Sequence, residues 1–186
     1  NAARNFLEVW EGAWFRVVGP SGTLNIAAPV GVSAAALVSG PAAQAEVPEG
    51  GWLLPIEARA AGRADVTTLA GVGSGPDAQG YRVENPPQIP GSVDVYFTGA
   101  GGELLAHDIR PAGAGAMVWT FAVETELPNT EVELTLPDLS GVPSDLAVYL
   151  TDEDTGQRMY ARTLPAYTFV TDADGAVRHF SLEVVP

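Results

Sequence analysis

The chain contains no cysteine and no lysine, has only two histidines, and has no long apolar run. Without cysteine it can form no disulfide, no thiolate metal site and no thiol nucleophile. The most apolar stretch, residues 30–38, is far shorter than the roughly 20 residues that a membrane helix requires. We therefore expect a soluble chain without membrane insertion.

Positive charge is scarce. Nine basic residues, all arginine, stand against 23 acidic residues, and the formal net charge is −14. A surface of this sign repels phosphate backbones and anionic headgroups, so nucleic acid is excluded as a partner. An acidic chain without lysine or cysteine, rich in Thr, Gly and Pro, is typical of exported bacterial surface proteins, and we expect an extracellular or cell-surface location.

Helix-forming patterns are also scarce, whereas 21 Gly and 15 Pro supply many turns. In the last third of the chain, apolar side chains fall on every second residue in six short runs, a period that indicates strands with one buried face. Six strands at near-regular spacing predict a β-sandwich. The runs are marked by Trp119, Phe121, Val123; Val132, Leu134, Leu136; Leu146, Val148, Leu150; Met159, Ala161; Tyr167, Phe169; and Phe180, Leu182, Val184.

The earlier part of the chain predicts a second β unit. Strands are expected at 52–60 and 65–72, with Pro55 indicating an edge position or a bulge, and a hairpin is expected from 93–97 and 104–109. Residues 111–115 are the expected domain boundary. The predicted fold is therefore all-β with two β-sandwich units, at 12–112 and at 116–186, preceded by a separate terminal strand at 1–11.

The C-terminal sandwich is predicted to be immunoglobulin-like but one strand short. An immunoglobulin-type sandwich needs seven strands, and an unfilled sheet edge must be covered. The terminal segment carries Phe6, Leu7, Val9 and Trp10 in an extended pattern ahead of Gly12. Donation of this segment to a neighbouring copy would fill the edge and build a filament, whereas folding back in cis would make it an ordinary first strand. The sequence leaves both open.

A catalytic site is not expected. His107 and His179 are the only histidines, and both fit a solvated or packed role. Gly73-Ser74-Gly75 lacks the glycine spacing of a nucleophile elbow. No base and nucleophile can be assembled from the pattern, so we expect no enzyme activity and no cofactor.

Two ligands remain as weaker predictions. Acidic turns carry Asp152 and Asp154 and, further on, Asp172 and Asp174, which supply the hard oxygen ligands of calcium, although neither turn fits the EF-hand spacing. Four Trp and five Tyr could build a glycan platform. Trp10 and Trp14 would lie about 13 Å apart on one face of a continuous strand, but Gly12 is expected to break that strand. Trp52 and Trp119 fit a core role better.

The order of core and turn residues resembles the C-terminal immunoglobulin-like β-sandwich regions of large secreted bacterial surface proteins, including modules near sorting signals and the immunoglobulin-like domain of the flagellar hook-cap protein. The resemblance covers roughly residues 51–186 and implies an exported, noncatalytic β domain; the sorting signal itself is missing. It is carried by Trp52, Asp65, Gly71-Val72, Asp108-Ile109-Arg110-Pro111, Trp119-Thr120-Phe121, Glu133-Leu134-Thr135-Leu136, Tyr149-Leu150-Thr151-Asp152, Thr155-Gly156, Tyr167-Thr168-Phe169 and Arg178-His179-Phe180.

The resulting functional hypothesis is an extracellular structural subunit of a bacterial surface fibre, with other copies of itself as partner. The alternative is a carbohydrate- or surface-binding β-sandwich module of a larger secreted protein.

Overall fold

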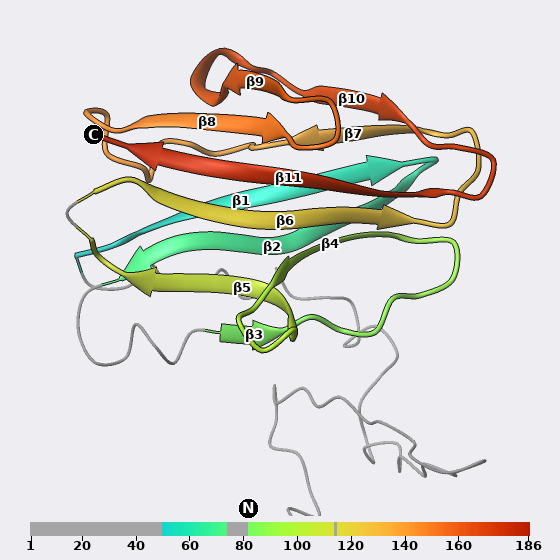
Figure 1. The fold of residues 1–186 in the computed structure, drawn as a ribbon, viewed down its shortest axis with the longest axis horizontal. Helices are drawn as coiled ribbons and strands as arrows, with labels where there is room; N and C mark the ends of the chain where they lie inside the picture. The colour runs from blue at the N-terminus through green and yellow to red at the C-terminus, as the bar shows by residue number, and fades with distance from the viewer. Residues whose placement is uncertain (1–49, 74–81, 114) are drawn as a thin grey trace, which may run out of the picture. The chain divides into compact units, whose positions relative to one another are not determined.

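The computed structural model describes residues 50–73, 82–113 and 115–186 (Figure 1). The chain divides into two compact units, 1–45 and 46–186, and all the described residues belong to the second. Their elements are β1 (Trp52–Ala60), β2 (Arg63–Gly73), β3 (Arg82–Glu84), β4 (Val93–Thr98), β5 (Leu104–Pro111), β6 (Met117–Thr125), β7 (Glu131–Thr135), β8 (Ala147–Asp152), β9 (Gln157–Tyr160), a 3-10 turn η3 (Ala161–Thr163), β10 (Tyr167–Val170) and β11 (Ala176–Val185).

All these strands belong to one sheet, and the prediction of an all-β fold is confirmed. The strand order is β10-β7-β1-β2-β5-β4-β6-β11-β8-β9, with β3 attached to β5. Neighbours are antiparallel except β2 and β5, which run parallel from the pair Leu69 and His107 to the pair Gly73 and Pro111. The sequence patterns did not indicate this parallel pair.

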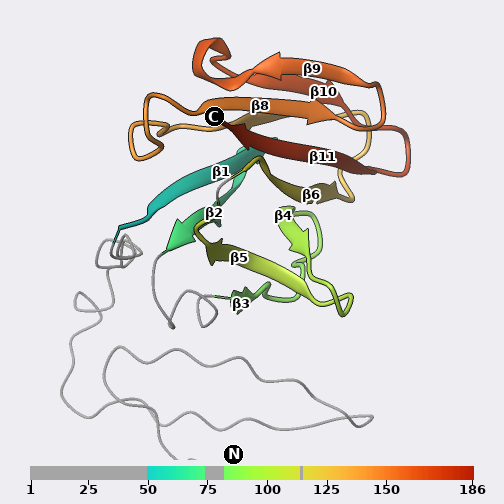
Figure 2. The ribbon, with the colours of Figure 1, turned by 60° about the vertical axis from the view of Figure 1, so that its left-hand side comes forward.

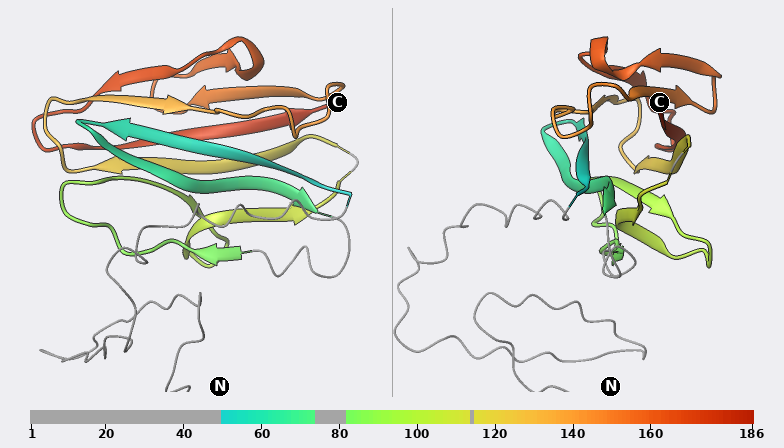
Figure 3. Two further views of the ribbon diagram at one scale, coloured as in Figure 1. Left: turned by 180° about the vertical axis from the view of Figure 1, so that it is seen from behind. Right: turned by 90° about the vertical axis from the view of Figure 1, so that its left-hand side faces the viewer.

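The sheet curls so that its two halves face each other across one interior (Figures 2 and 3). Trp52 on β1 and Trp119 on β6 are not on neighbouring strands, yet their rings meet edge to face with centroids 5.6 Å apart. Tyr167 on β10 likewise contacts Phe180 on β11 at 5.8 Å. Such contacts between distant strands of one sheet require that the sheet closes over a common core.

Alternating burial explains why these segments form strands. In β1 every second side chain from Trp52 to Ala60 is buried, and β11 repeats the alternation from Phe180 to Val184. Because buried side chains recur at every second residue, one face of each strand lies against the interior. Burial of a large apolar side chain there contributes about 2 kcal/mol to the free energy of unfolding. The six strands predicted in the last third of the chain are confirmed as β6 to β11.

The predicted division into two sandwich units is not confirmed. Strands before the predicted boundary pair with strands after it, since β1 pairs with β7 and β4 pairs with β6. A single core cluster contains side chains from both sides of the boundary. The reason is that neither set of strands alone covers its apolar face, so the two sets share one interior.

The expectation of a missing strand in the last third of the chain also changes. The positions beside β7 and β6 are filled in cis by β1 and β4, which belong to the same chain. The strands of the last third of the chain therefore gain neighbours from the earlier part of the same chain. The ends of the strand order lie elsewhere, at β10 and β9.

The segment Asp172-Ala173-Asp174-Gly175 has the composition of a hairpin turn, but it does not join two neighbouring strands of the sheet. Asp172 and Gly175 do form an isolated antiparallel bridge, but β10 pairs with β7 while β11 pairs with β6 and β8. The two strands lie in opposite halves of the curled sheet. The contact between Phe169 and Phe180 across the interior, with ring centroids 6.0 Å apart, is evidence of this arrangement.

Pro55 lies where β1 has a neighbouring strand on one side, which suits a residue that has no N–H to donate. The pairing of β1 with β7 covers only Glu57 to Ala60, so at Pro55 the strand has β2 on one side. The register with β2 shifts between Ile56 and Ala58, which marks a bulge. Of the two alternatives that the sequence predicted, the bulge is present, whereas β1 is an interior strand of the sheet that lacks its β7 neighbour at Pro55.

The β1–β2 hairpin contains one strained residue. Ala61 and Gly62 form its two-residue turn with φ of 46° and 76°, a conformation that Gly and Asn adopt more easily than Ala. Replacing Ala61 by Asn should raise the free energy of unfolding by about 1 kcal/mol, measured by urea denaturation. Gly62→Ala is the matched control and should lower it by a similar amount. A neutral or destabilising Ala61→Asn change would contradict this account of the turn.

Candidate functional site

The predicted donor residues Phe6, Leu7, Val9 and Trp10 lie outside the described residues. What the structure describes is the set of sheet edges that could accept a strand. Among the described strands these edges are β9 and β10 at the two ends of the strand order, and β3 on β5. The two ends differ in charge.

The β9 edge carries a charged side chain. Arg158 lies in the middle of this strand, with its guanidinium carbon 3.8 Å from the centre of the Tyr149 ring, and it forms an ion pair with Glu183 on β11. Charged side chains on an edge strand are a common protection against pairing with other chains. This edge is therefore a poor acceptor for an added strand.

The β10 edge carries no charge. Its four residues are Tyr167, Thr168, Phe169 and Val170; the two aromatic rings face the interior and the two β-branched residues face solvent. Val170 is 62% exposed, which is high for an apolar side chain within a strand. An uncharged edge of β-branched and aromatic residues has the composition that pairs most readily with another strand.

The backbone of this edge is oriented for pairing. The N–H of Thr171 donates to the carbonyl of Thr130 at 3.0 Å, which places the odd-numbered residues of β10 in the hydrogen-bonded positions toward β7. Because antiparallel ladders alternate, the N–H and C=O groups of Thr168 and Val170 point away from β7 toward the free edge. An added strand would form backbone hydrogen bonds with these four groups.

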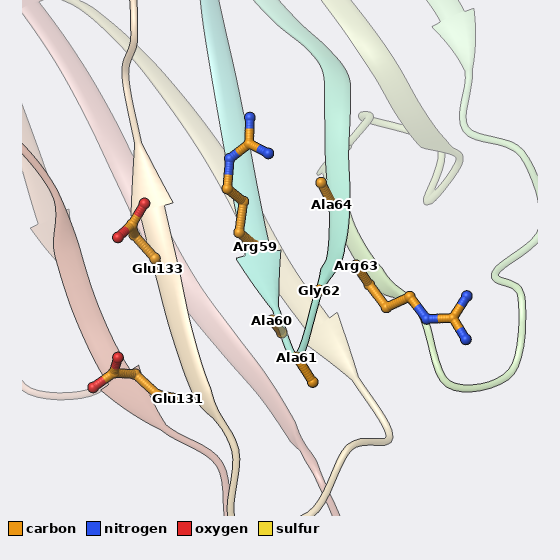
Figure 4. Close-up of a pocket in the computed structure, with 8 residues that line it drawn as sticks. All are labelled: Arg59, Ala60, Ala61, Gly62, Arg63, Ala64, Glu131 and Glu133. Atoms are coloured by element: carbon orange, nitrogen blue, oxygen red, sulfur yellow. The ribbon is translucent and has the colours of Figure 1, made fainter.

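Carboxylates line the outer face of the neighbouring strand. Glu133 lies opposite Thr168 on one side and Arg59 on the other, and Glu131 lies opposite Val170. Figure 4 shows these glutamates together with Arg59 and Arg63, which line the same hollow of about 350 Å³. Glu131 and Glu133 thus place two carboxylates on the strand next to β10, with Arg59 beyond them on β1.

Asp152, the first residue of the predicted calcium set, is instead bound by protein donors. Its carboxylate accepts hydrogen bonds from Arg178 Nε at 3.0 Å and Nη2 at 2.7 Å, from the Tyr167 hydroxyl, and from the backbone N–H groups of Asp154 and Thr155. Burial acts to raise the pKa of Asp152, but the bonds from Arg178 and Tyr167 outweigh it and lower the pKa from 3.8 to about 2. The cluster joins β8, β10 and β11.

Of the other acidic residues in that prediction, Asp154 lies at the exposed margin of this cluster, 3.9 Å from Arg178 Nε, while the other two lie elsewhere. Asp154 accepts a hydrogen bond from the N–H of His179 at 2.8 Å, and Asp172 and Asp174 are exposed in the turn before β11. Within the ranges that the structure describes, no group of three or more Asp, Glu or His side chains is close enough to hold a metal ion. Calcium binding stays a prediction.

The two histidines belong to different parts of the sheet. His107 lies on β5, with Nε2 3.1 Å from the carbonyl of Thr67, and burial lowers its pKa. His179 lies on β11, which β4 and β6 separate from β5. The structure therefore does not bring them together.

Two of the four tryptophans are core residues. Trp52 and Trp119 are buried against each other, and the Trp119 indole N–H donates to the carbonyl of Asp108 at 2.9 Å. Neither ring presents a face to solvent for sugar stacking. Trp10 and Trp14 lie outside the described residues.

Sequence reasoning missed the Asp152 and Arg178 pair, although the pattern contained a signal. Asp152 follows Val148 and Leu150 in the buried phase of β8, and Arg178 precedes Phe180 in the buried phase of β11. Opposite charges in the apolar phase of two strands indicate a buried ion pair. The β10 edge was missed because a strand count predicts that a neighbour is missing but not beside which strand.

Comparison with known proteins adds no assignment. No family model, no curated protein and no solved structure matches this chain. In the part of the chain that the structure describes, there is no helix with the length and apolar character needed to cross a membrane.

Proposed function

We propose that this chain is an extracellular, noncatalytic structural subunit of a bacterial surface fibre, in which copies assemble head to tail by exchange of a donor strand. The observation that carries the proposal is the uncharged, solvent-facing edge of β10, beside a single large core. The acidic, lysine-free composition and the resemblance to exported surface modules support the location.

Strand exchange accounts for assembly without a large preformed interface. An added strand gains main-chain hydrogen bonds along its length and covers alternate side chains of the acceptor. When each copy donates one segment and accepts another, the contact is heterologous and does not close, and the product is a filament. The terminal segment with Phe6, Leu7, Val9 and Trp10 is the proposed donor.

Sedimentation velocity and electron microscopy of the full chain test this function. We expect a concentration-dependent series of oligomers, and replacement of Phe6, Leu7, Val9 and Trp10 together by Ser should leave monomers, because these residues supply the apolar contacts of the donor. Replacement of Asn1, Ala2 and Ala3 by Ser is the matched control and should leave assembly unchanged. Monomers at all concentrations in the unmodified chain, or undiminished assembly of the fourfold Ser variant, would contradict the proposal.

Glycan binding is the second candidate function. It is favoured by an aromatic pair on the outer face, where Tyr149 and Tyr160 lie with ring centroids 5.5 Å apart and Tyr160 is exposed. A glycan-binding module would remain monomeric and would lose its ligand on Tyr160→Ala. Glycan-array binding by a monomeric chain would favour this function over the fibre.

A further inference from the structure

We infer that a hollow on the outer face of β4, β6 and β11 binds a lysine side chain of a basic partner protein. The hollow has a volume of about 400 Å³ and lies between Thr98 and Leu104 at one end and His179 and Glu153 at the other. This surface is separate from the β10 edge, and binding at it does not depend on strand exchange.

The hollow arises from one small side chain between two rings. Tyr96 on β4 and His179 on β11 both lie opposite Ala122 on β6. Since neighbouring strands are about 4.8 Å apart, the two rings start from backbone positions roughly 10 Å apart, with only a methyl group between them. The strand β4 then leaves β6 and pairs through Thr98 with Leu104 on β5, which opens the hollow at this end.

The walls of the hollow are apolar, and one of them is fixed. The Tyr96 hydroxyl donates to Glu124 at 2.7 Å, which holds the ring in place. Leu104 is 44% exposed and presents an apolar side chain at the opening. The methylene stem of a long basic side chain would bury apolar surface against these walls while its charged head stays in reach of water.

The end of the hollow beside β8 is acidic. Glu153 lines it, and the neighbouring Asp154 accepts the backbone N–H of His179 at 2.8 Å and lies 3.5 Å from its Nδ1. Among the described residues that line the hollow, there is no Arg. A cationic head at the end of an apolar stem would therefore gain a counter-charge here, and the net charge of −14 attracts basic proteins to the surface.

The surroundings of Glu153 favour an ammonium over a guanidinium. Its Oε1 already accepts a hydrogen bond from the Ser181 hydroxyl. Arginine binds a carboxylate most strongly through both oxygens at once, whereas the point charge of lysine needs only one. The chain itself contains nine Arg and no Lys, so a second copy cannot supply this side chain and the partner is a different protein.

The rim of the hollow favours a polypeptide over a free amine. Thr98 and Thr120 are both exposed there. A hydroxyl can donate to a peptide carbonyl and accept from a peptide N–H, so these residues could bind the backbone on either side of a lysine. A free alkylamine would make neither contact.

Saturation-transfer NMR of the full chain tests the inference, because the method detects weak binding to a monomer and to a filament alike. The probe is a capped Gly-Lys-Gly peptide at pH 8, where an unperturbed imidazole is neutral. We expect binding, with the largest saturation on the methylene protons of lysine. Capped Gly-norleucine-Gly has the same stem without the charge and should bind about tenfold more weakly.

Two variants localise the binding. Glu153→Gln keeps an acceptor for Ser181 but removes the charge, and it should weaken binding of capped Gly-Lys-Gly by about tenfold. Glu131→Gln is the matched control, since it changes the net charge equally at an exposed residue of β7, and it should leave binding unchanged. Unchanged circular dichroism of both variants establishes that they fold.

Several results would overturn the inference. Equal binding of the norleucine peptide would show that no cation is recognised, and equal losses in the two variants would show that net charge acts rather than the hollow. Capped Gly-Arg-Gly bound as tightly would remove the preference for lysine, and butylamine bound as tightly would remove the polypeptide partner. Saturation of cellotetraose without saturation of the lysine peptide would assign the hollow to a neutral glycan instead.

Discussion

Replacing Asp152 by Asn should lower the free energy of unfolding by about 3 kcal/mol. The carboxylate of Asp152 is inaccessible to solvent and balances the charge of Arg178, whose side chain is only 23% exposed. An amide in its place leaves the guanidinium largely buried without a counter-charge and weakens the bond from Tyr167. Removal of one partner from such a pair costs more than the pair contributes, because the remaining charge is desolvated.

Chemical denaturation of Asp152→Asn measures this effect, and Asp154→Asn is the matched control. Asp154 is two residues away but its side chain is 43% exposed, so its replacement should change stability by less than about 0.5 kcal/mol. Equal stability of the two variants would contradict the assignment of Asp152 as the buried centre of the cluster.

The same carboxylate predicts a pH dependence. Its pKa is about 2 in the folded chain and about 3.9 when unfolded, so the unfolded state binds the proton more tightly. The stabilisation that this difference provides, about 3 kcal/mol, is complete above about pH 5 and is lost as the pH falls through the folded-state pKa. Asp152→Asn should lack this part of the acid-unfolding profile.

Replacing Trp119 by Ala should lower the free energy of unfolding by about 4 kcal/mol. Trp119 is completely buried where β6 faces β1, and its ring contacts Trp52 across the interior. Its loss leaves a cavity between the two halves of the sheet. It also leaves the carbonyl of Asp108 without the indole N–H that donates to it.

Trp119→Phe separates the two contributions. Phenylalanine fills most of the space but cannot donate a hydrogen bond, so this variant should be less destabilised than Trp119→Ala, by about 2 kcal/mol. Tyr160→Ala is the control at an exposed aromatic and should change little. All three are measured by thermal and urea unfolding. A Trp119→Ala variant as stable as Tyr160→Ala would contradict the central position of Trp119.

The Asp152 cluster also links stability to the proposed acceptor edge. Tyr167 belongs to β10, and its hydroxyl donates to Asp152 on β8, so β10 is held from the interior by a buried polar contact as well as by its pairing with β7. Loss of Asp152 should therefore loosen the edge on which the donor segment is proposed to add.

Much of the fold could be predicted from the sequence because the apolar pattern of a strand is a local property of its own residues. A period of two in the apolar residues identified every strand from β6 to β11, and Pro55 indicated an edge position or a bulge, of which β1 has the bulge. These features depend only on which face of a segment is apolar and on whether a residue has an N–H to donate. Both properties are readable in the chain itself.

The choice of neighbours was decided only by tertiary structure. Backbone hydrogen bonds are the same for every residue except proline, so alternation says which side chains are buried but not which strand lies alongside. For this reason β1 and β4 lie beside strands of residues 116–186, and the turn at 172–175 joins opposite halves of the sheet rather than a hairpin. The uncharged residues of β10 are plain in the sequence, but their exposure at a free edge depends on where every other strand has paired.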